Sequence, residues 1–165
     1  MKMERNLVNK DGKPYVVAVI PAFNEEKSIA KVLLLVKKYV DLVIVGDDGS
    51  DDMTGEIAKA LGAIVVRNDR NRGKGYTLKR LFNEALELGA DVIVALDADG
   101  QHNPNYIPKL IEPIINGEAD IVIGSRYQGV SSERIPLYRK IGLKIIGIFH
   151  KPVIKGVKDT QSGYR

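Results

Sequence analysis

Short runs of Val, Ile, Leu and Ala recur along the first 125 residues, each separated from the next by a more polar stretch. The runs are continuous rather than alternating, which is typical of strands buried on both faces of a parallel sheet. They predict five strands, at residues 15–20, 42–45, 63–66, 92–96 and 121–123. Pro21 should end the first strand, because proline cannot donate a hydrogen bond to a neighbouring strand.

The stretches between these runs repeat apolar residues three and four positions apart, which is the spacing of one helix face. Asn24 is the predicted N-cap of the first helix, and a second helix is expected near residues 53–61. The inward residues of the first, third and fourth helices are expected to be Ile29, Val32, Leu33 and Val36; Leu78, Leu81, Phe82 and Ala85; and Ile107, Leu110, Ile111 and Ile114. Strands alternating with helices predict an α/β fold with three αβα layers around a mostly parallel, doubly wound sheet.

The 165 residues suit one domain with an uneven distribution of charge. Residues 1–14 are expected to be a flexible lead-in and residues 15–125 the α/β core. The formal net charge is +4, but residues 126–165 carry nine Lys and Arg against two acids, a net of +7 that leaves −3 for the rest. A basic end of this kind indicates an anionic partner, and nucleic acid, an anionic membrane surface and a phosphorylated substrate all fit at this point.

Other features of the sequence concern where in the cell the protein is located. The chain has no cysteine, so neither disulfides nor thiolate chemistry is available. The polar N-terminus does not resemble a signal peptide, and no apolar run has the length of a membrane span, which together predict a cytoplasmic protein. The apolar segment 135–149 also carries basic residues, so it is either a helix packed on the sheet edge or an amphipathic segment in a membrane interface.

Two carboxylates one residue apart, Asp97 and Asp99, follow the fourth apolar run. The carboxyl ends of strands in an open α/β sheet are where ligands bind. Two carboxylates placed there repel each other unless a cation or a shared proton relieves them. The pair is either a solvated acidic turn or a site for a divalent metal that carries a diphosphate.

Further polar loops follow the other strands, at residues 21–25, 47–52, 67–75 and 124–126, and should share one edge of the sheet with the acidic pair. In the third of them Gly73-Lys74-Gly75 combines close backbone approach with a compact positive charge. The spacing disfavours a dinucleotide fingerprint, a P-loop and a serine-hydrolase elbow, because the glycines and serines that these motifs need are missing. A haloacid-dehalogenase-type phosphatase remains an alternative, since residues 95–100 resemble its nucleophile motif, although on the fourth strand rather than the first.

Taken together, the segments 21–25, 47–54, 71–75, 97–102, 124–126 and 159–165 resemble glycosyltransferase family 2, which has the GT-A fold. Within that family the resemblance is greatest to the polyprenyl-phosphate (dolichyl-phosphate) sugar synthases. It makes residues 15–125 a nucleotide-sugar-binding core and 126–165 a part that faces the acceptor and the membrane. Since members of the family normally continue further, the chain is expected to be truncated at its C-terminus.

The resemblance also implies site residues. The nucleotide sugar would contact Pro21, Phe23, Glu25, Val45, Asp47, Lys74, Asp97 and Ala98. The metal, Mg²⁺ or Mn²⁺, would be held by Asp97, Asp99 and Gln101, and the catalytic residues would be Asp97, Asp99 and Arg126. The acceptor phosphate would be bound by Arg126, Arg139, Ser162 and Arg165. Phe23 stands where these synthases often have Tyr, and Gly46 replaces a more usual apolar residue.

The function that these expectations describe is inverting sugar transfer from a UDP- or GDP-sugar to a polyprenyl (dolichyl) phosphate. The enzyme would be peripheral at the cytoplasmic face of the membrane. A family member with a hydroxyl acceptor and a non-catalytic membrane-docking module remain alternatives beside the phosphatase. Nucleic acid is not an expected partner, because the basic residues are not interleaved with aromatic residues and the strand-end loops are rich in carboxylates.

Overall fold

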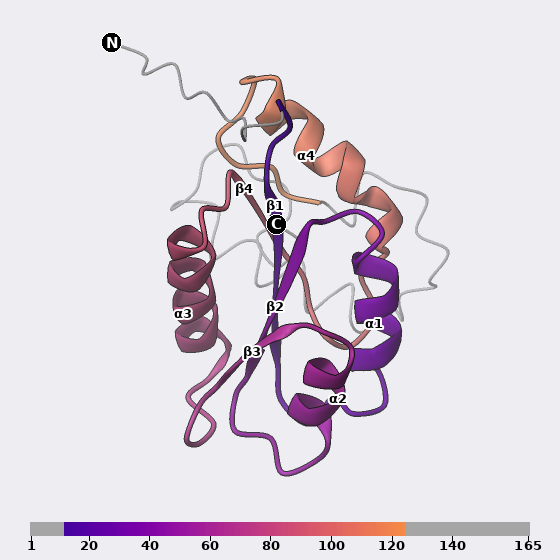
Figure 1. Cartoon of the computed structure of the whole chain (residues 1–165), viewed down its shortest axis with the longest axis vertical. Coiled ribbons are helices and arrows are strands. Elements are labelled where there is room, and N and C mark those ends of the chain that lie inside the picture. The colour runs from indigo at the N-terminus through magenta and orange to yellow at the C-terminus, as the bar shows by residue number, and fades with distance from the viewer. Residues whose placement is uncertain (1–11, 125–165) are drawn as a thin grey trace, which may run out of the picture.

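The computed structural model describes residues 12–124, which form one parallel sheet with helices on both faces (Figure 1). Its elements are β1 (Val16–Ala22), α1 (Ile29–Val36), β2 (Leu42–Asp47), α2 (Thr54–Ala60), β3 (Ile64–Arg67), α3 (Lys74–Glu87), β4 (Val92–Ala95), the 3₁₀ helix η1 (Pro104–Tyr106) and α4 (Ile107–Ile115). The strand order is β3-β2-β1-β4, and all three pairings are parallel. None of the helices in this part of the chain is long and apolar enough to cross a membrane.

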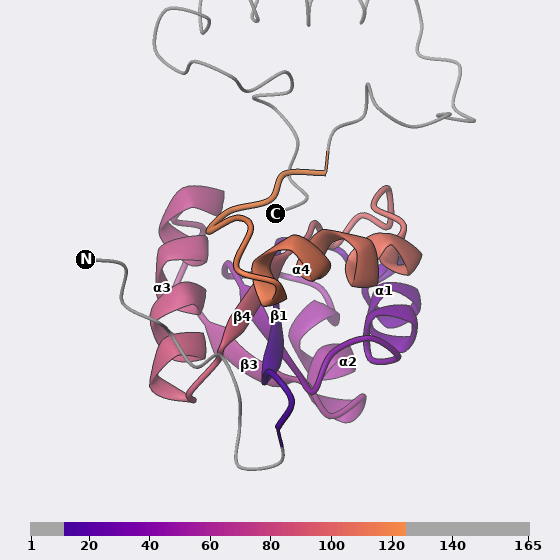
Figure 2. The ribbon, with the colours of Figure 1, turned by 90° about the horizontal axis from the view of Figure 1, so that it is seen from above.

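The sheet is the middle of three layers, with α3 on one face and α1, α2 and α4 on the other (Figure 2). Successive strand residues point to opposite faces, and both faces are covered, so every residue of β1 except the partly exposed Pro21 is buried. Val17 and Val19 pack in the cluster that contains Leu81 of α3, whereas Ala18 and Ile20 pack with α1. The predicted αβα arrangement and doubly wound parallel sheet are therefore confirmed.

Strand β1 differs from the prediction because it continues through Pro21, which pairs in register with Gly46. The carbonyl of Val19 accepts a hydrogen bond from Leu96 of the β4 side. Pro21 lies two residues later and so faces the same side, where β4 has already ended at Ala95. Pro21 has no register partner in β4, so the strand tolerates a residue without an N–H at this point.

Asn24 is not the N-cap of the first helix, which begins only at Ile29. Its backbone adopts a left-handed conformation with φ 54°, a region that asparagine tolerates better than most residues. The side-chain oxygen accepts a hydrogen bond from the N–H of Asp51, and the backbone N–H donates to Oγ of Ser50. Asn24 thus joins the loop after β1 to the loop after β2.

Two other predictions were wrong. Residues 121–123 form no strand, and Ile121 is 74% exposed. An apolar run indicates that a segment can pair, but not that a strand edge lies within its reach. Phe82 lies on the exposed side of α3, because Leu81 and Ala85 take the buried positions of that helix.

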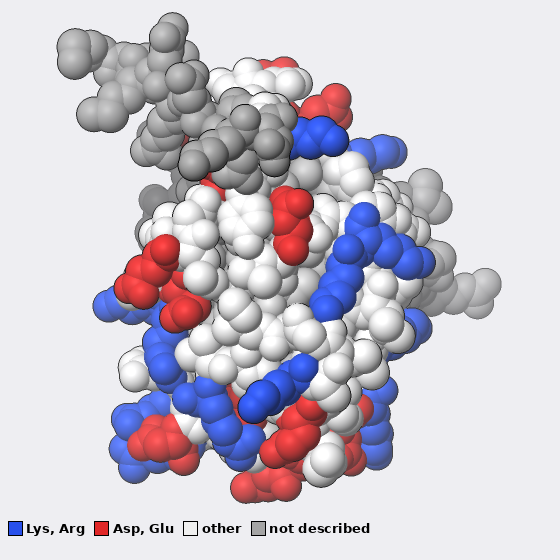
Figure 3. Space-filling view, in the orientation of Figure 1, with Lys and Arg blue, Asp and Glu red and all other residues white. Residues whose placement is uncertain are grey.

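The order of the strands reverses at β1, since β2 and β3 lie on one side of it and β4 on the other. In open α/β sheets a ligand binds in the crevice outside the carboxyl ends of the strands at such a point. These ends lie at the bottom of Figure 1, where charged side chains of both signs gather on the surface (Figure 3).

Candidate active site

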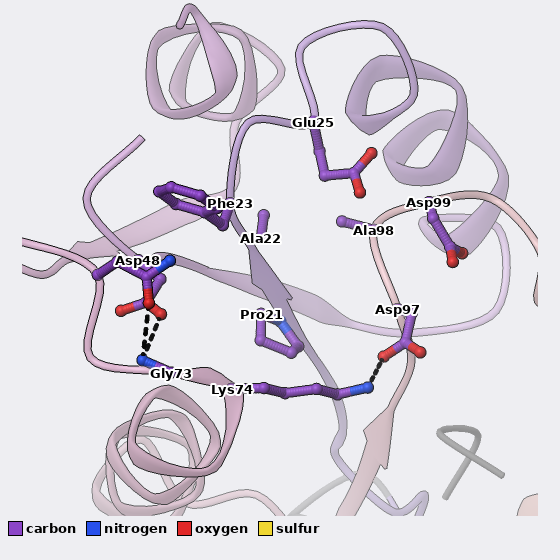
Figure 4. A pocket seen from close by; sticks show the side chains of 11 residues that line it. Pro21, Ala22, Phe23, Glu25, Asp48, Gly73, Lys74, Asp97, Ala98 and Asp99 are labelled. Carbon is purple, nitrogen blue, oxygen red and sulfur yellow. Dashed lines mark hydrogen bonds and ion pairs between the residues drawn. The ribbon is translucent and has the colours of Figure 1, made fainter. Parts of the chain in front are cut away.

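A pocket lies at the carboxyl edge of the sheet, where loops from four parts of the chain meet (Figure 4). It is lined by Pro21 and Ala22 at the end of β1 and Phe23 and Glu25 after it, by Asp48 after β2, by Asn71, Gly73 and Lys74 before and in α3, and by Asp97, Ala98 and Asp99 after β4. The structure therefore brings together seven of the residues predicted from the sequence: Pro21, Phe23, Glu25, Lys74, Asp97, Ala98 and Asp99.

The acidic pair is held in a turn that directs both carboxylates to the pocket wall. The backbone N–H of Asp97 donates to Nδ1 of His102 over 3.1 Å. Oδ1 of Asp99 accepts a hydrogen bond of 2.9 Å from the N–H of Gln101, and Gly100 between them has a positive φ of 75°. The turn residues thus fix the backbone, while the carboxylates remain at the pocket.

Lys74 reaches across the pocket from the opposite loop and forms an ion pair with Asp97 (Figure 4). Its backbone begins α3, and Gly73 before it has a φ of 89°, which favours glycine. The side chain of Lys74 is 51% exposed and that of Asp97 27% exposed, so solutes can reach the ion pair.

Asp48 is buried and ties the loop before α3 to the end of β2. It accepts hydrogen bonds of 2.8 Å from the N–H groups of Arg72 and Gly73, and one of 2.6 Å from Nδ2 of Asn68. Burial would raise the pKa of the Asp48 carboxyl, but the hydrogen bonds from Arg72, Asn68 and Gly73 outweigh it and hold the pKa below its ordinary value. Nδ2 of Asn68 also donates to Oγ1 of Thr77, which extends the network into α3.

Asp47, the acid predicted to contact the nucleotide, does not line the pocket. Its carboxylate is fully buried, where it accepts a 2.9 Å hydrogen bond from the N–H of Ser50 and pairs with Arg67 at 2.5 Å. Strand alternation gives the reason: Asp47 points to the same face as Val43 and Val45, and Gly55 of α2 packs against it.

Strand alternation was the signal that distinguishes the two acids, because Asp48 points away from α2 and reaches the pocket. By the same alternation Val45 is buried in the core on the side of α1 and α2 and does not line the pocket. Gln101 is exposed, and its backbone contacts Asp99, but its side chain is not part of the lining. Arg126, Arg139, Ser162 and Arg165 lie outside the described residues, so their predicted roles stay predictions.

Sequence reasoning also missed Ala22 and Asn71, two residues of the pocket lining. Ala22 pairs with Asp47 as the last residue of β1, and nothing in an alanine indicates a site. Oδ1 of Asn71 accepts a 3.0 Å hydrogen bond from the N–H of Gly73, which is a turn contact that the tripeptide Asn-Arg-Gly is compatible with but does not specify.

The chemistry of the pocket wall suits a hard divalent cation, which prefers carboxylate oxygens. Asp97 and Asp99 offer such oxygens from one turn, and Glu25 lines the same pocket. Within residues 12–124, no three His, Asp or Glu side chains come close enough to form a metal site among themselves. The acidic pair therefore fits a cation that takes further oxygens from another molecule.

A parallel, doubly wound sheet with an acidic pair facing a lysine in its crevice defines an α/β domain suited to a phosphorylated ligand. The model of the glycosyl transferase family 2 matches residues 17–158, and the chain belongs to this family. The predicted family is thereby confirmed, and with it an enzyme of the glycosyltransferase class.

Individual relatives within this family have names that specify an acceptor. The chain is 36% identical over 172 residues to UDP-N-acetylglucosamine–dolichyl-phosphate N-acetylglucosaminyltransferase of Methanococcus voltae, covering 91% of this chain and 68% of the relative. It is 37% identical over 161 residues to dolichol-phosphate mannosyltransferase of Pyrococcus furiosus, covering 90% and 45%. These names agree with the predicted transfer to a polyprenyl phosphate.

The glucosyl-3-phosphoglycerate synthase of Mycobacterium tuberculosis, solved with Mn²⁺, UDP-glucose and phosphoglyceric acid, superposes with a TM-score of 0.54 and 33% identity. The match covers 62% of this chain and 40% of that one. Together with the family match, this likeness agrees with the expected GT-A fold. The chain thus spans less than half of this structure and of the Pyrococcus relative.

Proposed function

We propose that this chain acts as an inverting, metal-dependent glycosyltransferase that moves a sugar from a nucleoside-diphosphate sugar to a polyprenyl phosphate. The observation that carries the proposal is the convergence of Asp97 and Asp99 with Lys74 on one pocket at the point where the strand order reverses. The two archaeal relatives support the acceptor by their names, and the mycobacterial structure supports the metal and the diphosphate donor by its contents.

Each side of the pocket has its own task in this proposal. Asp97 and Asp99 would hold Mg²⁺ or Mn²⁺, which neutralises the charge that develops on the departing diphosphate. Lys74 would contact the same diphosphate, helped by the N–H groups in the first turn of α3, which have no partner within the helix. Phe23 and Glu25 line the pocket after β1, where the base and ribose would lie.

The acceptor side of the proposal rests on charge. A phosphate acceptor is already ionised near neutral pH, so it needs orientation rather than a strong general base. Residues 126–165 carry a net charge of +7, and Arg126, Arg139, Ser162 and Arg165 are the proposed phosphate contacts. The same charge would hold the enzyme at an anionic cytoplasmic membrane surface. Sedimentation with vesicles that contain or lack an anionic lipid tests this location.

The first experiment measures donor binding. UDP, GDP and their sugars are titrated into the full chain by calorimetry, with and without MnCl₂. We expect one nucleotide to bind, to bind more tightly with Mn²⁺, and to lose this Mn²⁺ effect in Asp99→Ala. Asp120→Ala, which removes an exposed acid outside the pocket, is the matched control and should bind like the wild type. Failure of both nucleotides to bind the folded wild type contradicts the proposal.

The second experiment identifies the acceptor. Transfer of a radiolabelled sugar from the preferred donor is measured to a polyprenyl phosphate and to 3-phosphoglycerate, with the full chain. After solvent extraction, a labelled polyprenyl-phosphate sugar is recovered in the organic phase. Label that is transferred to this product alone supports the proposed acceptor. Product from 3-phosphoglycerate alone would assign this chain the kind of acceptor named for the mycobacterial structure instead.

A further inference from the structure

One ion pair occupies two groups that the proposed function needs for different ligands. Nζ of Lys74 pairs with Oδ1 of Asp97, and both residues line the pocket. In the proposed function the ammonium contacts a diphosphate, and the carboxylate contacts a divalent cation. Neither group can take its own ligand while it keeps the other as partner.

We infer that the Lys74–Asp97 ion pair couples the two ligands, so that binding of the divalent cation and of the nucleoside diphosphate strengthen each other. The inference rests on the proposed function. Coupling of this kind is reciprocal, because a ligand that tightens the binding of a second one is itself bound more tightly in its presence.

The charges in the pocket give the direction of the coupling. A cation that takes Asp97 without a nucleotide leaves the ammonium of Lys74 beside a second positive charge. A diphosphate that takes Lys74 without a cation faces the carboxylates of Asp97 and Asp99. With both ligands bound, the ammonium of Lys74 contacts the diphosphate and the carboxylate of Asp97 contacts the cation. Two new contacts between opposite charges then replace the one ion pair that is lost.

The surroundings allow this exchange without movement of the backbone. The N–H of Gly73 is held by Asp48, and the N–H of Asp97 is held by Nδ1 of His102. These fixed points are the backbone of Asp97 and of the residue before Lys74, whereas the side chains of Lys74 and Asp97 are 51% and 27% exposed. A change of side-chain rotamer is therefore sufficient to separate them.

The test compares the affinity for MnCl₂ alone with the affinity in the presence of saturating UDP or GDP, whichever the wild type binds. The electron paramagnetic resonance signal of free Mn²⁺ gives both affinities in the full chain. In Lys74→Met we expect Mn²⁺ alone to bind about fivefold more tightly than to the wild type, because its competitor for Asp97 is gone. The factor by which the nucleotide tightens Mn²⁺ binding should fall by roughly the same amount.

Lys79→Met is the matched control, since Lys79 is an exposed lysine on the same helix and does not line the pocket. It should keep both wild-type affinities. Lys74→Gln removes the same charge with a polar side chain and should behave like Lys74→Met. Association of Mn²⁺ with the nucleotide in solution is the same in all samples and cancels between variants.

Two results overturn the inference, and they are distinguishable. If Lys74→Met or Lys74→Gln binds Mn²⁺ alone as weakly as the wild type or more weakly, while the wild type binds nucleotide with Mn²⁺, the coupling is refuted and the proposed function stands. If the wild type binds neither nucleotide, the proposed function fails and the inference fails with it.

Discussion

Two acidic pairs lie at the carboxyl ends of strands β2 and β4, at the same edge of the sheet, and they differ in where their carboxylates point. Asp47 and Asp48 are buried and accept hydrogen bonds from neighbouring backbone and side-chain donors. Asp99 is exposed and Asp97 half-buried, and both line the pocket. The first pair holds loops in place, whereas the second lies at the wall of the pocket, open to solutes.

The difference shows that two acids after a strand do not by themselves indicate a ligand site. A carboxylate that accepts several hydrogen bonds from the protein has little capacity left for a ligand, and its removal costs stability. A carboxylate at a pocket wall contributes little to stability and is available for chemistry. The comparison therefore predicts that variants of the two pairs separate into losses of activity and losses of stability.

The largest expected effect is on activity, in Asp99→Asn. The amide keeps an oxygen that can accept the hydrogen bond from Gln101, so the turn should persist, but the negative charge for the metal is lost. We expect kcat/KM for sugar transfer to fall by at least about a hundredfold. The free energy of unfolding should stay within about 0.5 kcal/mol of the wild type, as measured by urea denaturation. A clear loss of stability would show that Asp99 holds its loop in place, as Asp47 and Asp48 do, and would contradict the difference between the two pairs.

The next effect is on stability, in Asp47→Asn. An amide in place of the carboxylate loses the charge opposite Arg67 and turns a donor toward either Arg67 or the N–H of Ser50. The expected loss in the free energy of unfolding is about 2 kcal/mol, the range for a hydrogen bond to a charged group. Asp51→Asn, at an exposed position of the same loop, is the control and should change stability little. An Asp47→Asn protein as stable as this control would show that the buried pair does not hold the loop.

Most of the fold followed from the sequence because the apolar runs and helix periods are determined locally. Four of the five predicted strands and all four predicted helices are present in residues 12–124. The errors arose where a local pattern depends on a distant neighbour: Pro21 is tolerated because β4 has already ended, and residues 121–123 do not pair with a strand in this part of the chain.

The site was predicted less completely, for the same kind of reason. Lys74 and the acidic pair were found because their charges stand out at strand and helix ends. The choice between Asp47 and Asp48 depended on which face of β2 each side chain takes, which requires counting the alternation from the buried Val43 and Val45. That count was available in the sequence, but the side-chain partner Arg67 of Asp47 and the partners Asn68 and Arg72 of Asp48 lie 20 residues or more away.

Asp48 combines a feature of each pair, because it is buried like Asp47 but lines the pocket like Asp97 and Asp99. Asp48→Asn should lower the free energy of unfolding at pH 7 by about 1.5 kcal/mol, since an amide cannot accept from the N–H groups of both Arg72 and Gly73 as the carboxylate does. It should also weaken nucleotide binding, because the same loop positions Lys74.

The effect of Asp48 should depend on pH with a definite sign. Its pKa is lowered in the folded state, so its stabilising contribution is present above the ordinary value of about 3.9 and is lost as the pH falls toward the lowered one. The stability difference between wild type and Asp48→Asn should therefore be constant from pH 7 to about 5 and shrink below about 4. Urea denaturation at pH 7, 5, 4 and 3 measures it. A difference that grows toward pH 3 would contradict this assignment.

The smallest expected effect concerns how closely α3 approaches the sheet beside the pocket. A Cβ added at Gly46 would overlap Cγ2 of Thr77 and lie 2.9 Å from Cδ1 of Leu81, so Gly46→Ala requires these buried side chains of α3, or the helix itself, to shift. We expect a stability loss of about 1 kcal/mol and weaker nucleotide binding, because Thr77 and Lys74 move with the helix. Gly75→Ala, also in α3 but with open space around an added Cβ, should instead stabilise by about 0.5 kcal/mol through helix propensity. Opposite signs for these two alanines in the free energy of unfolding, together with weaker nucleotide binding in Gly46→Ala alone, would support the idea that close packing of α3 on β2 positions the lysine side of the pocket. Wild-type nucleotide binding in a destabilised Gly46→Ala protein would contradict this.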